Sequence, residues 1–324
     1  MSTRQKVLEE LERKKGMSIS GEELAARLNV TRAAIWKAIQ ELKKEGYQIE
    51  AATNRGYCLD ANTDILSAEG IKLYLPTSLK EISILVYDRL DSTNQAAKKA
   101  ALEGAAHGTV FLAGEQTAGR GRMGRSFYSP PHCGIYMSFI LRPELTAGEA
   151  GLLTTAAAIA VCRAIEKVTT RRAQIKWVND ILLEGKKICG ILTEAAADLE
   201  SGQLEYAVLG IGINYTVPPG GYPQTLTEKA GALFGKEAEG VGRNRLAAEV
   251  ICQALQICSA LKEREYLKEY RSRSAVIGRP VRLTGRNLEA TAVDIGSEGQ
   301  LVLEFPDGRR EQLASGEIQI KGLY

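Results

Sequence analysis

The chain has 324 residues, of which 44% are hydrophobic and 25% are charged. These ordinary values exclude a disordered, collagen-like or low-complexity chain, and the length indicates two or three domains. The longest apolar run, Leu152–Cys162, is too short to span a bilayer and predicts a buried helix. Because the N-terminus is charged and lacks an apolar signal region, we expect no export signal and a cytoplasmic location.

The cysteines, histidines and net charge narrow the class further. Six cysteines are dispersed along the chain without a C-x-x-C pair, which favours buried thiols in a reducing cytosol over a disulfide framework. Only two histidines are present, so we do not expect a zinc site. The net charge of +3 does not by itself indicate a nucleic-acid-binding protein, and any such assignment depends on motif geometry.

Three segments differ in their patterning. Residues 1–63 predict short helices followed by a β-hairpin, residues 64–274 alternate between strand and helix patterns, and residues 275–324 contain short β runs with glycine-rich turns. We therefore predict an α+β multidomain chain with joints in the polar stretches 60–64 and 271–278.

The first segment reads as a winged helix-turn-helix. Ser20–Glu23 fits an S-x-x-E capping box, and Thr31 can cap a second helix that runs to Lys44 with one apolar face. Two strand-like runs, 47–49 and 57–59, follow it as a wing. A capped helix of this kind can insert its first turns into a major groove, although a helical hairpin used for dimerisation or domain packing would share the pattern. The predicted DNA-binding residues are Thr31, Arg32, Trp36, Lys37, Gln40 and Arg55.

A basic glycine loop, Gly119–Arg125, is the most unusual stretch of the chain. It matches G-x-G-x-x-G, but the residues Ser126–Pro131 cannot begin the long helix that a dinucleotide fold requires, and no P-loop pattern is present. Arginines interleaved with glycines suit a phosphate or carboxylate, so we expect a mobile loop that an anionic ligand orders. A solvated basic loop or an RNA-contacting loop remains the alternative.

A second patch, Lys176–Asp180, precedes two apolar runs that predict a β-hairpin with Lys187 near the start of its second strand. Lys187 can reach an anion on the sheet face, or it can be an ordinary lysine at a hairpin end. Asp180 can be a turn residue or a possible Mg²⁺ contact, since Mg²⁺ takes one or two carboxylates plus phosphate oxygens.

Two smaller motifs carry polar groups. Ser92 and Gln95 fit an S-x-x-Q capping box before a helical run, and the same hydroxyls and amides could fix a polar ligand. Gly210–Asn214 ends a buried apolar run, where the glycines allow close backbone packing and Asn214 could contact a nucleobase edge.

Taken together, D-S-T-N at 91–94, Q-T-A-G-R-G-R at 116–122, K-W-x-N-D at 176–180, K-x-x-G-I-L at 187–192 and G-x-G-I-N at 210–214 resemble the bifunctional biotin–protein ligases that also repress the biotin operon. The resemblance covers nearly the whole chain. It implies a winged helix-turn-helix (1–63), an α/β ligase core with a mixed sheet of the biotin/lipoyl ligase type (64–274) and an SH3-like β-barrel (275–324). Val178 replaces the family's usual Pro, and Met123 stands where a further Arg is common.

The resemblance also implies residue roles. The biotin-binding residues would be Ser92, Thr93, Asn94, Gln116, Arg120, Gly121, Arg122 and Lys187. The adenylate-binding residues would be Asn214, Lys321, Asp180, Lys176, Trp177 and Asn179. Lys187, Arg122 and Arg120 would be catalytic.

The implied reaction joins biotin and ATP, with Mg²⁺ and no tightly bound prosthetic group, into biotinyl-5′-AMP, and then transfers biotin to a lysine of a biotin carboxyl carrier domain. A homodimer holding the adenylate would bind operator DNA as a repressor. The alternatives are a biotin-sensing repressor without catalysis and a lipoate or octanoate ligase.

Overall fold

The computed structural model describes residues 1–52, 55–236, 240–284 and 288–320, and these form two compact units. The first unit holds Met1–Lys80 together with Gly242–Ala248. The second holds Glu81–Val241 and the chain from Glu249 onward. The predicted division of the chain into three domains at residues 63 and 274 stays a prediction.

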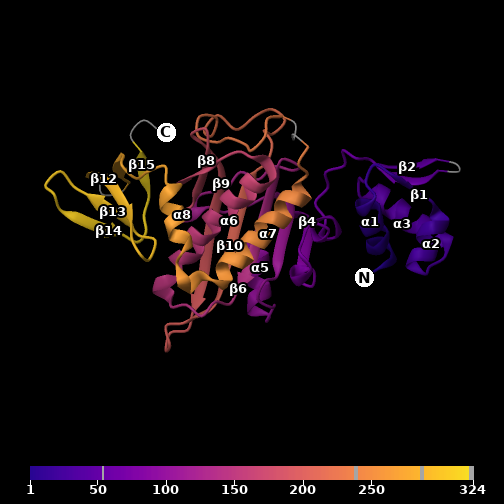
Figure 1. The fold of residues 1–324 in the computed structure, drawn as a ribbon, viewed down its shortest axis with the longest axis horizontal. Coiled ribbons are helices and arrows are strands. Elements are labelled where there is room, and N and C mark those ends of the chain that lie inside the picture. The colour runs from indigo at the N-terminus through magenta and orange to yellow at the C-terminus, as the bar shows by residue number, and fades with distance from the viewer. Residues whose placement is uncertain (53–54, 237–239, 285–287, 321–324) are drawn as a thin grey trace. The chain divides into compact units, whose positions relative to one another are not determined.

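The first unit contains the predicted helix-turn-helix and wing (Figure 1). Its elements are α1 (Thr3–Arg13), β1 (Ser18–Ile19), α2 (Gly21–Leu28), α3 (Arg32–Lys44), β2 (Ile49–Ala52), β3 (Gly56–Leu59), α4 (Ala68–Lys72) and a 3-10 turn (Thr77–Leu79). As predicted, the Thr31 hydroxyl caps α3 by accepting the Ala34 N–H, and one face of α3 is buried in a core shared with α1 and α2. The wing is a three-stranded sheet in the order β1-β3-β2, one short strand more than the predicted hairpin.

The second unit is built on a seven-stranded mixed sheet in the order β4-β5-β6-β10-β9-β8-β7. Its strands are β4 (Ile84–Leu90), β5 (Val110–Gln116), β6 (Gly134–Leu141), β7 (Gln174–Lys176), β8 (Asp180–Leu183), β9 (Lys186–Ala197) and β10 (Leu204–Asn214). Only β4 and β5 are parallel; the other pairs are antiparallel, including the predicted β8–β9 hairpin.

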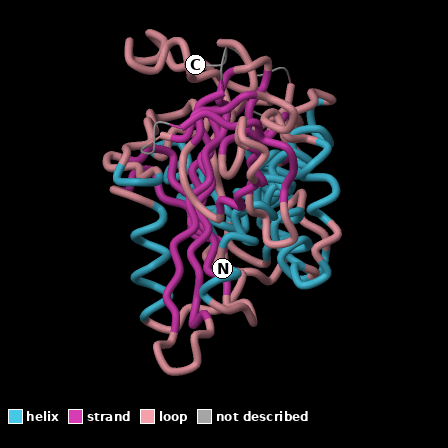
Figure 2. Tube along the Cα trace, turned by 90° about the vertical axis from the view of Figure 1, so that its left-hand side faces the viewer, coloured by secondary structure: helices cyan, strands magenta, loops and turns pink. Residues whose placement is uncertain are grey.

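Helices cover both faces of this sheet, and Figure 2 shows the strands as a layer with helices on either side. The helices and 3-10 turns are α5 (Thr93–Leu102), η2 (Arg122–Gly124), η3 (Ala147–Glu149), α6 (Gly151–Thr169), α7 (Arg243–Ser259, which belongs to this unit from Glu249 onward), η4 (Leu261–Glu263) and α8 (Tyr266–Ser272). Tyr206 and Val208 of β10 pack with α5 in one apolar cluster, whereas Thr193 of β9 bonds Thr154 of α6. Because side chains alternate along a strand, α5 and α6 lie on opposite faces.

Helix α6 contains the predicted buried apolar run, and thirteen of its residues are buried. Among the described residues, the stretch Ala147–Thr169 is long and apolar enough to cross a bilayer by length and composition alone, with a mean hydropathy of 1.3. Within this stretch, 72% of the most apolar 18-residue window is buried inside the protein, so the helix is the core helix of the second unit.

The last five strands form an antiparallel sheet in the order β14-β13-β12-β11-β15. They are β11 (Pro280–Leu283), β12 (Leu288–Ile295), β13 (Leu301–Glu304), β14 (Arg310–Leu313) and β15 (Ile318–Ile320). The predicted β segment is confirmed, and its closure into an SH3-like barrel stays a prediction. All six cysteines are free thiols.

Candidate active site

The second unit encloses a cavity of about 140 Å³ between the α5 face of the sheet, the arginine–glycine loop and the segment Gly316–Ile318. Twelve residues singled out from the sequence line it. They are Ser92, Thr93, Asn94, Gln116, Arg120, Gly121, Arg122, Lys176, Trp177, Asn179, Asp180 and Lys187. The loop and the hairpin lysine, 65 positions apart between Arg122 and Lys187, therefore face one shared space.

One end of the cavity is a buried network of hydroxyls and amides. The Gln116 Oε1 atom accepts hydrogen bonds from the backbone N–H of Thr93, at 2.9 Å, and from its hydroxyl, at 3.1 Å. The Ser138 hydroxyl lies 2.7 Å from Thr93 Oγ1 and 2.6 Å from Asn94 Oδ1. Asn94 Nδ2 donates to Glu194 Oε2 at 2.9 Å. These bonds fix donors and acceptors in an apolar surrounding, as recognition of a small polar head group requires.

Ser92 does not form the capping box that was one interpretation of the sequence. It occupies the N-cap position of α5 without a side-chain capping bond, and its own N–H donates to Asp91 Oδ1 at 2.6 Å. With the Gln95 amide oxygen turned toward the loop, that oxygen accepts hydrogen bonds from the Arg120 guanidinium. At the start of α5, the Ser92 side chain thus lines the cavity and the Gln95 side chain contacts the arginine–glycine loop, and neither caps the helix.

Three glycines form the floor of the cavity, and Phe127 packs over two of them. A Cβ atom added at Gly212 would lie 2.5 Å from the Phe127 ring, and one at Gly190 would lie 3.1 Å from it. A Cβ atom at Gly210 would lie 2.1 Å from Asn94 Oδ1. The close backbone packing predicted for Gly210–Asn214 is therefore required by these two side chains.

The arginine–glycine loop has defined partners. Arg122 Nη1 donates to Asn179 Oδ1 at 3.3 Å and to the Gly316 carbonyl at 3.4 Å. Arg125 forms a two-pronged ion pair with Glu317, which raises the pKa of Arg125 and lowers that of Glu317. Carboxylate and carbonyl oxygens thus balance the loop charge from across the cavity.

The opposite wall carries two lysines and one carboxylate. Lys187 Nζ lies 2.6 Å from Asp180 Oδ1 across the β8–β9 hairpin. Lys176 is half-buried, and burial lowers its pKa, while Asp180 opposes this shift and Lys187 adds to it. Asn179 donates from Nδ2 to the Ile191 carbonyl at 3.0 Å, which leaves its oxygen for Arg122.

The cations in this site outnumber the anions, which favours an anionic ligand. Asp180 is the carboxylate near Lys187, and no cluster of three or more acidic, His or Cys side chains suited to a metal occurs in the described part of the chain. One carboxylate fits Mg²⁺ that arrives bound to phosphate oxygens, and not a cation held by protein ligands alone.

One predicted adenylate contact, Asn214, lies apart from this lining. Asn214, at the end of β10, is not among the lining residues, and its Nδ2 donates to the Gly231 carbonyl at 2.8 Å. Gly231 belongs to a short stretch, residues 229–231, that pairs with Lys187. The Lys187 N–H donates to the Lys229 carbonyl at 2.8 Å. Lys321 lies outside the described residues.

Three residues of the site were not predicted from the sequence. Phe127 and Glu317 line the cavity, and Ser138 bonds the lining residues Thr93 and Asn94. Ser138 has a recognisable signal, because it is a fully buried hydroxyl in the otherwise apolar strand β6. Glu317 has no local signal, since its partner Arg125 is 192 residues away.

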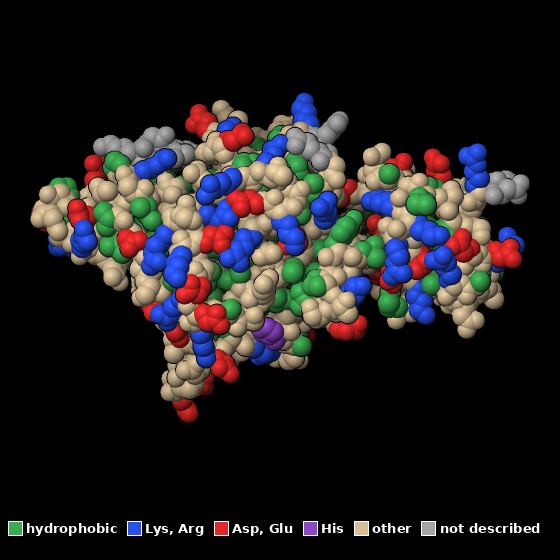
Figure 3. All heavy atoms as spheres, in the orientation of Figure 1, with side chains coloured by type: hydrophobic (Ala, Val, Ile, Leu, Met, Phe, Trp, Pro, Cys, Tyr) green, Lys and Arg blue, Asp and Glu red, His purple; other side chains and the backbone are tan. Residues whose placement is uncertain are grey.

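The predicted DNA-binding residues lie on the first unit. Arg32, Trp36 and Lys37 are exposed on α3, with Trp36 59% exposed, and Gln40 is half-buried. Arg55 is exposed in the turn between β2 and β3. Basic and acidic side chains are interspersed on the face of the molecule that Figure 3 shows.

Comparison with known proteins agrees with this geometry. Residues 86–214 match the model of the biotin/lipoate A/B protein ligase family, residues 3–58 match a helix-turn-helix (HTH) domain, and residues 276–321 match the biotin protein ligase C-terminal domain. The chain is 36% identical over 312 residues to the bifunctional ligase/repressor BirA of Bacillus subtilis (strain 168), covering 93% of this chain and 94% of that one.

Two further relatives are a ligase and a solved structure. The biotin–[acetyl-CoA-carboxylase] ligase of Mycobacterium tuberculosis is 31% identical over 70% of this chain and 85% of its own length. The biotin protein ligase from Aquifex aeolicus, solved with biotin and ATP, superposes with a TM-score of 0.61 at 25% identity, covering 74% of this chain and 98% of that one. Fold and site thus define an ATP-dependent protein ligase core joined to a DNA-binding domain. The chain belongs to the BirA family of bifunctional ligase/repressors.

Proposed function

We propose that this chain activates biotin with ATP to biotinyl-5′-AMP and then transfers biotin to a lysine of a biotin carboxyl carrier domain. The carrying observation is that Arg122 and Lys187 line one cavity with the buried Thr93–Asn94 network. The network supplies the donors and acceptors for a neutral head group, and the cations supply the field for a carboxylate and phosphates.

In the first step the biotin carboxylate attacks the α-phosphate of ATP, and pyrophosphate leaves. Both reactants are anions, so their approach costs Coulomb energy in a low-dielectric site. Arg120, Arg122 and Lys187 offset that repulsion and stabilise the charge that develops on the phosphate oxygens. Positioning and electrostatics carry this step, without a covalent nucleophile from the protein.

In the second step the amine of the acceptor lysine attacks the acyl carbon, and AMP leaves. The mixed anhydride is labile in water, so the loop that carries Arg122 protects it while it is bound. The contacts of Arg122 with Asn179 and of Arg125 with Glu317 close the loop against the opposite wall. Lys176, Trp177 and Asn179 would hold the adenylate, with Asn214 and Lys321 at its nucleotide end.

Mg²⁺ would neutralise triphosphate charge when bound, held by Asp180 together with phosphate oxygens.

The remaining parts of the proposal concern regulation. Thr31, Arg32, Trp36, Lys37, Gln40 and Arg55 would contact operator DNA, and a cytoplasmic homodimer holding biotinyl-5′-AMP would act as the repressor, because a two-fold dimer matches a palindromic site. The three domains would be 1–63, 64–274 and 275–324.

The deciding experiment incubates the purified chain with α-labelled ATP and either biotin or lipoate. Formation of a labelled adenylate with biotin, followed by mass-spectrometric detection of a biotinylated carrier domain, is the expected result. If the adenylate forms with lipoate and not with biotin, the chain is a lipoate ligase and the proposal is wrong. Biotin binding without adenylate would replace it with a sensing repressor that has no catalytic activity.

A further inference from the structure

We propose that helix α8 positions the segment Lys176–Asp180 for adenylate formation, with Tyr270 and Arg273 as positioning residues that never touch the ligand. This inference deepens the proposed function and rests on it. Neither Tyr270 nor Arg273 is among the residues that line the cavity, whereas Lys176, Trp177 and Asn179 are.

Tyr270 holds the middle of the segment. Its side chain is 0% exposed, and its hydroxyl donates to the Val178 carbonyl at 3.0 Å. Val178 stands between Trp177 and Asn179, so this bond sets the peptide from which two cavity-lining side chains project. A buried carbonyl that loses its donor is strongly disfavoured, so the backbone would rotate to seek another partner.

Arg273, directly after α8, holds the start of the segment through its main chain. The Ile175 N–H donates to the Arg273 carbonyl at 2.9 Å, and the Ala275 N–H donates to the Ile175 carbonyl at 2.8 Å. This short parallel bridge adds an outer partner to β7, the strand that ends at Lys176. The position of Lys176 therefore depends on where residue 273 is held.

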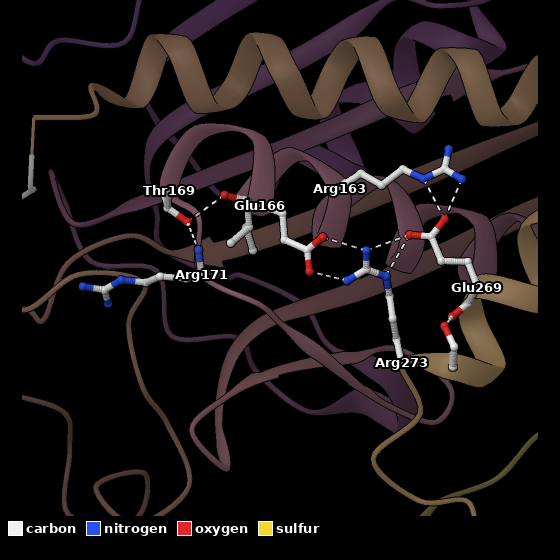
Figure 4. A network of polar contacts seen from close by, with 8 residues as sticks. Arg163, Glu166, Thr169, Arg171, Glu269 and Arg273 are labelled. Carbon is white, nitrogen blue, oxygen red and sulfur yellow. Dashed lines mark hydrogen bonds and ion pairs between the residues drawn. The ribbon is translucent and has the colours of Figure 1, made fainter.

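A network of charged side chains fixes the position of Arg273, as Figure 4 shows. Both guanidinium ends of Arg273 reach Glu166 of α6, and its Nε atom donates to Glu269 of α8 at 2.8 Å. Glu269 is also bonded by Arg163 of α6, at 2.8 and 2.6 Å. The Arg273 side chain is only 9% exposed, so solvent screens these bonds little.

The segment has one further anchor, from the C-terminal sheet. Trp177 Nε1 donates to the Gly299 carbonyl at 2.9 Å, and the indole is 4% exposed. The segment is thus fixed at Trp177, at Val178 and at the preceding residue Ile175, and the Asn179 oxygen accepts a hydrogen bond from Arg122. Precise support of this kind matters, because a small displacement of a reacting group costs a large factor in rate.

The test compares two tyrosines on the same helix. Tyr270→Phe removes the hydroxyl that holds Val178, and Tyr266→Phe removes one that donates to the Leu152 carbonyl at 3.1 Å and contacts no residue of 176–180 by a hydrogen bond. Both side chains are buried, and the Tyr266 hydroxyl also bonds Thr155 Oγ1 at 3.1 Å, so the control removes at least as much buried hydrogen bonding as Tyr270→Phe does. We expect Tyr270→Phe to lower kcat for biotinyl-5′-AMP formation about tenfold. The KM for biotin should change less than about twofold, because the Thr93–Asn94 pocket lies on other elements.

A spectroscopic measurement reports the segment directly. The chain has two tryptophans, so the protein labelled with 5-fluorotryptophan gives two ¹⁹F resonances, one from Trp36 and one from Trp177. Tyr270→Phe should shift the Trp177 resonance and leave that of Trp36 in place, whereas Tyr266→Phe should leave both in place. A Trp177→Phe sample assigns the two signals.

Equal kinetics of Tyr270→Phe and Tyr266→Phe, or an unmoved Trp177 resonance, would overturn the inference. If Tyr270→Phe does not fold, Arg273→Lys serves instead, since it keeps the charge but loses the planar fork, and it should give the same kcat loss and resonance shift. A wild-type protein that makes no biotinyl-5′-AMP would instead refute the proposed function, so the two failures are distinguishable.

Discussion

The ammonium of Lys187 lies 2.6 Å from the carboxylate of Asp180, and both side chains retain partial exposure, 31% and 19%. The pair joins the two strands of the β8–β9 hairpin at the cavity wall. Since the ion pair is not fully buried, a phosphate or carboxylate of a ligand can take over the lysine without leaving an uncompensated charge deep in the core.

Lys187→Ala should therefore lower the rate of biotinyl-5′-AMP formation about 10²-fold, the usual effect of removing one charge-stabilising donor. The thermal transition should move little, because partly exposed ion pairs contribute little to stability. The measurement is single-turnover formation of labelled adenylate. Lys186→Ala is the matched control, because Lys186 is the exposed neighbour and lies outside the lining. Wild-type adenylation by Lys187→Ala would refute its role.

Arg122→Gly should release the adenylate faster, by about tenfold, because the loop loses its contacts with Asn179 and the Gly316 carbonyl. A rapid-dilution assay of the preformed, labelled intermediate measures this rate. Leu199→Gln changes a side chain of the same unit that is 99% exposed and lies outside the lining, and it should leave the release rate unchanged. Identical leakage from the two variants would contradict a protective loop.

The local elements could largely be predicted from the sequence, because their signals are local. The Thr31 cap, the amphipathic face of α3 and the β8–β9 hairpin follow from residues a few positions apart. The expectation that the arginine–glycine loop and Lys187 share one site rested on the family resemblance and not on any sequence pattern. Partners that are remote in sequence, such as Glu317 for Arg125 and Phe127 over Gly212, depend on tertiary packing and gave no local signal.

The same distinction decides between the two interpretations that the sequence left open at the start of α5. A capping box at Ser92 and Gln95 satisfies the local pattern, yet the structure uses neither side chain in that way. Asp91 takes the Ser92 N–H, and Gln95 faces Arg120. Tertiary demand from the cavity outweighs a local hydrogen bond worth about 1 kcal/mol.

Gly212→Ala should weaken biotin binding about tenfold and destabilise the fold by about 1–3 kcal/mol, the usual cost of overpacking. The added methyl group would lie 2.5 Å from the Phe127 ring and push it off the cavity floor. Isothermal titration with biotin and thermal denaturation measure the two effects. Gly151→Ala has open space around it and provides the control. An unchanged affinity would show that the ring can move without affecting the ligand.

Lys176→Met should adenylate poorly, and its stability relative to the wild type should fall as the pH rises into the alkaline range. Burial lowers the pKa of Lys176, so the folded protein releases this proton more readily than the unfolded chain. Wild-type stability must then rise with pH between the lowered pKa and the unfolded value of about 10.4, and any advantage of Lys176→Met should shrink over that range. Denaturant unfolding at several alkaline pH values tests the sign, and a widening advantage would contradict it.

Lys37→Ala should weaken binding to duplex DNA and reduce the slope of log K against log salt by about 0.9, the value for one lost phosphate contact. Lys37 is exposed on α3. Fluorescence anisotropy across a salt series measures the slope. Arg13→Ala, on α1, is the control, because its side chain is engaged by Glu9 and Glu10. An unaltered slope for Lys37→Ala would argue for a helical hairpin that does not contact DNA.

The C-terminal sheet contributes one wall of the cavity through Gly316–Ile318 and accepts the indole N–H of Trp177 at Gly299. A recombination event that grafted a different small β domain onto this core would have to reproduce both interactions at once. The C-terminal sheet is therefore a structural part of the cavity, and a change at Gly299 or at Gly316 would alter the surroundings of Trp177 and Arg122.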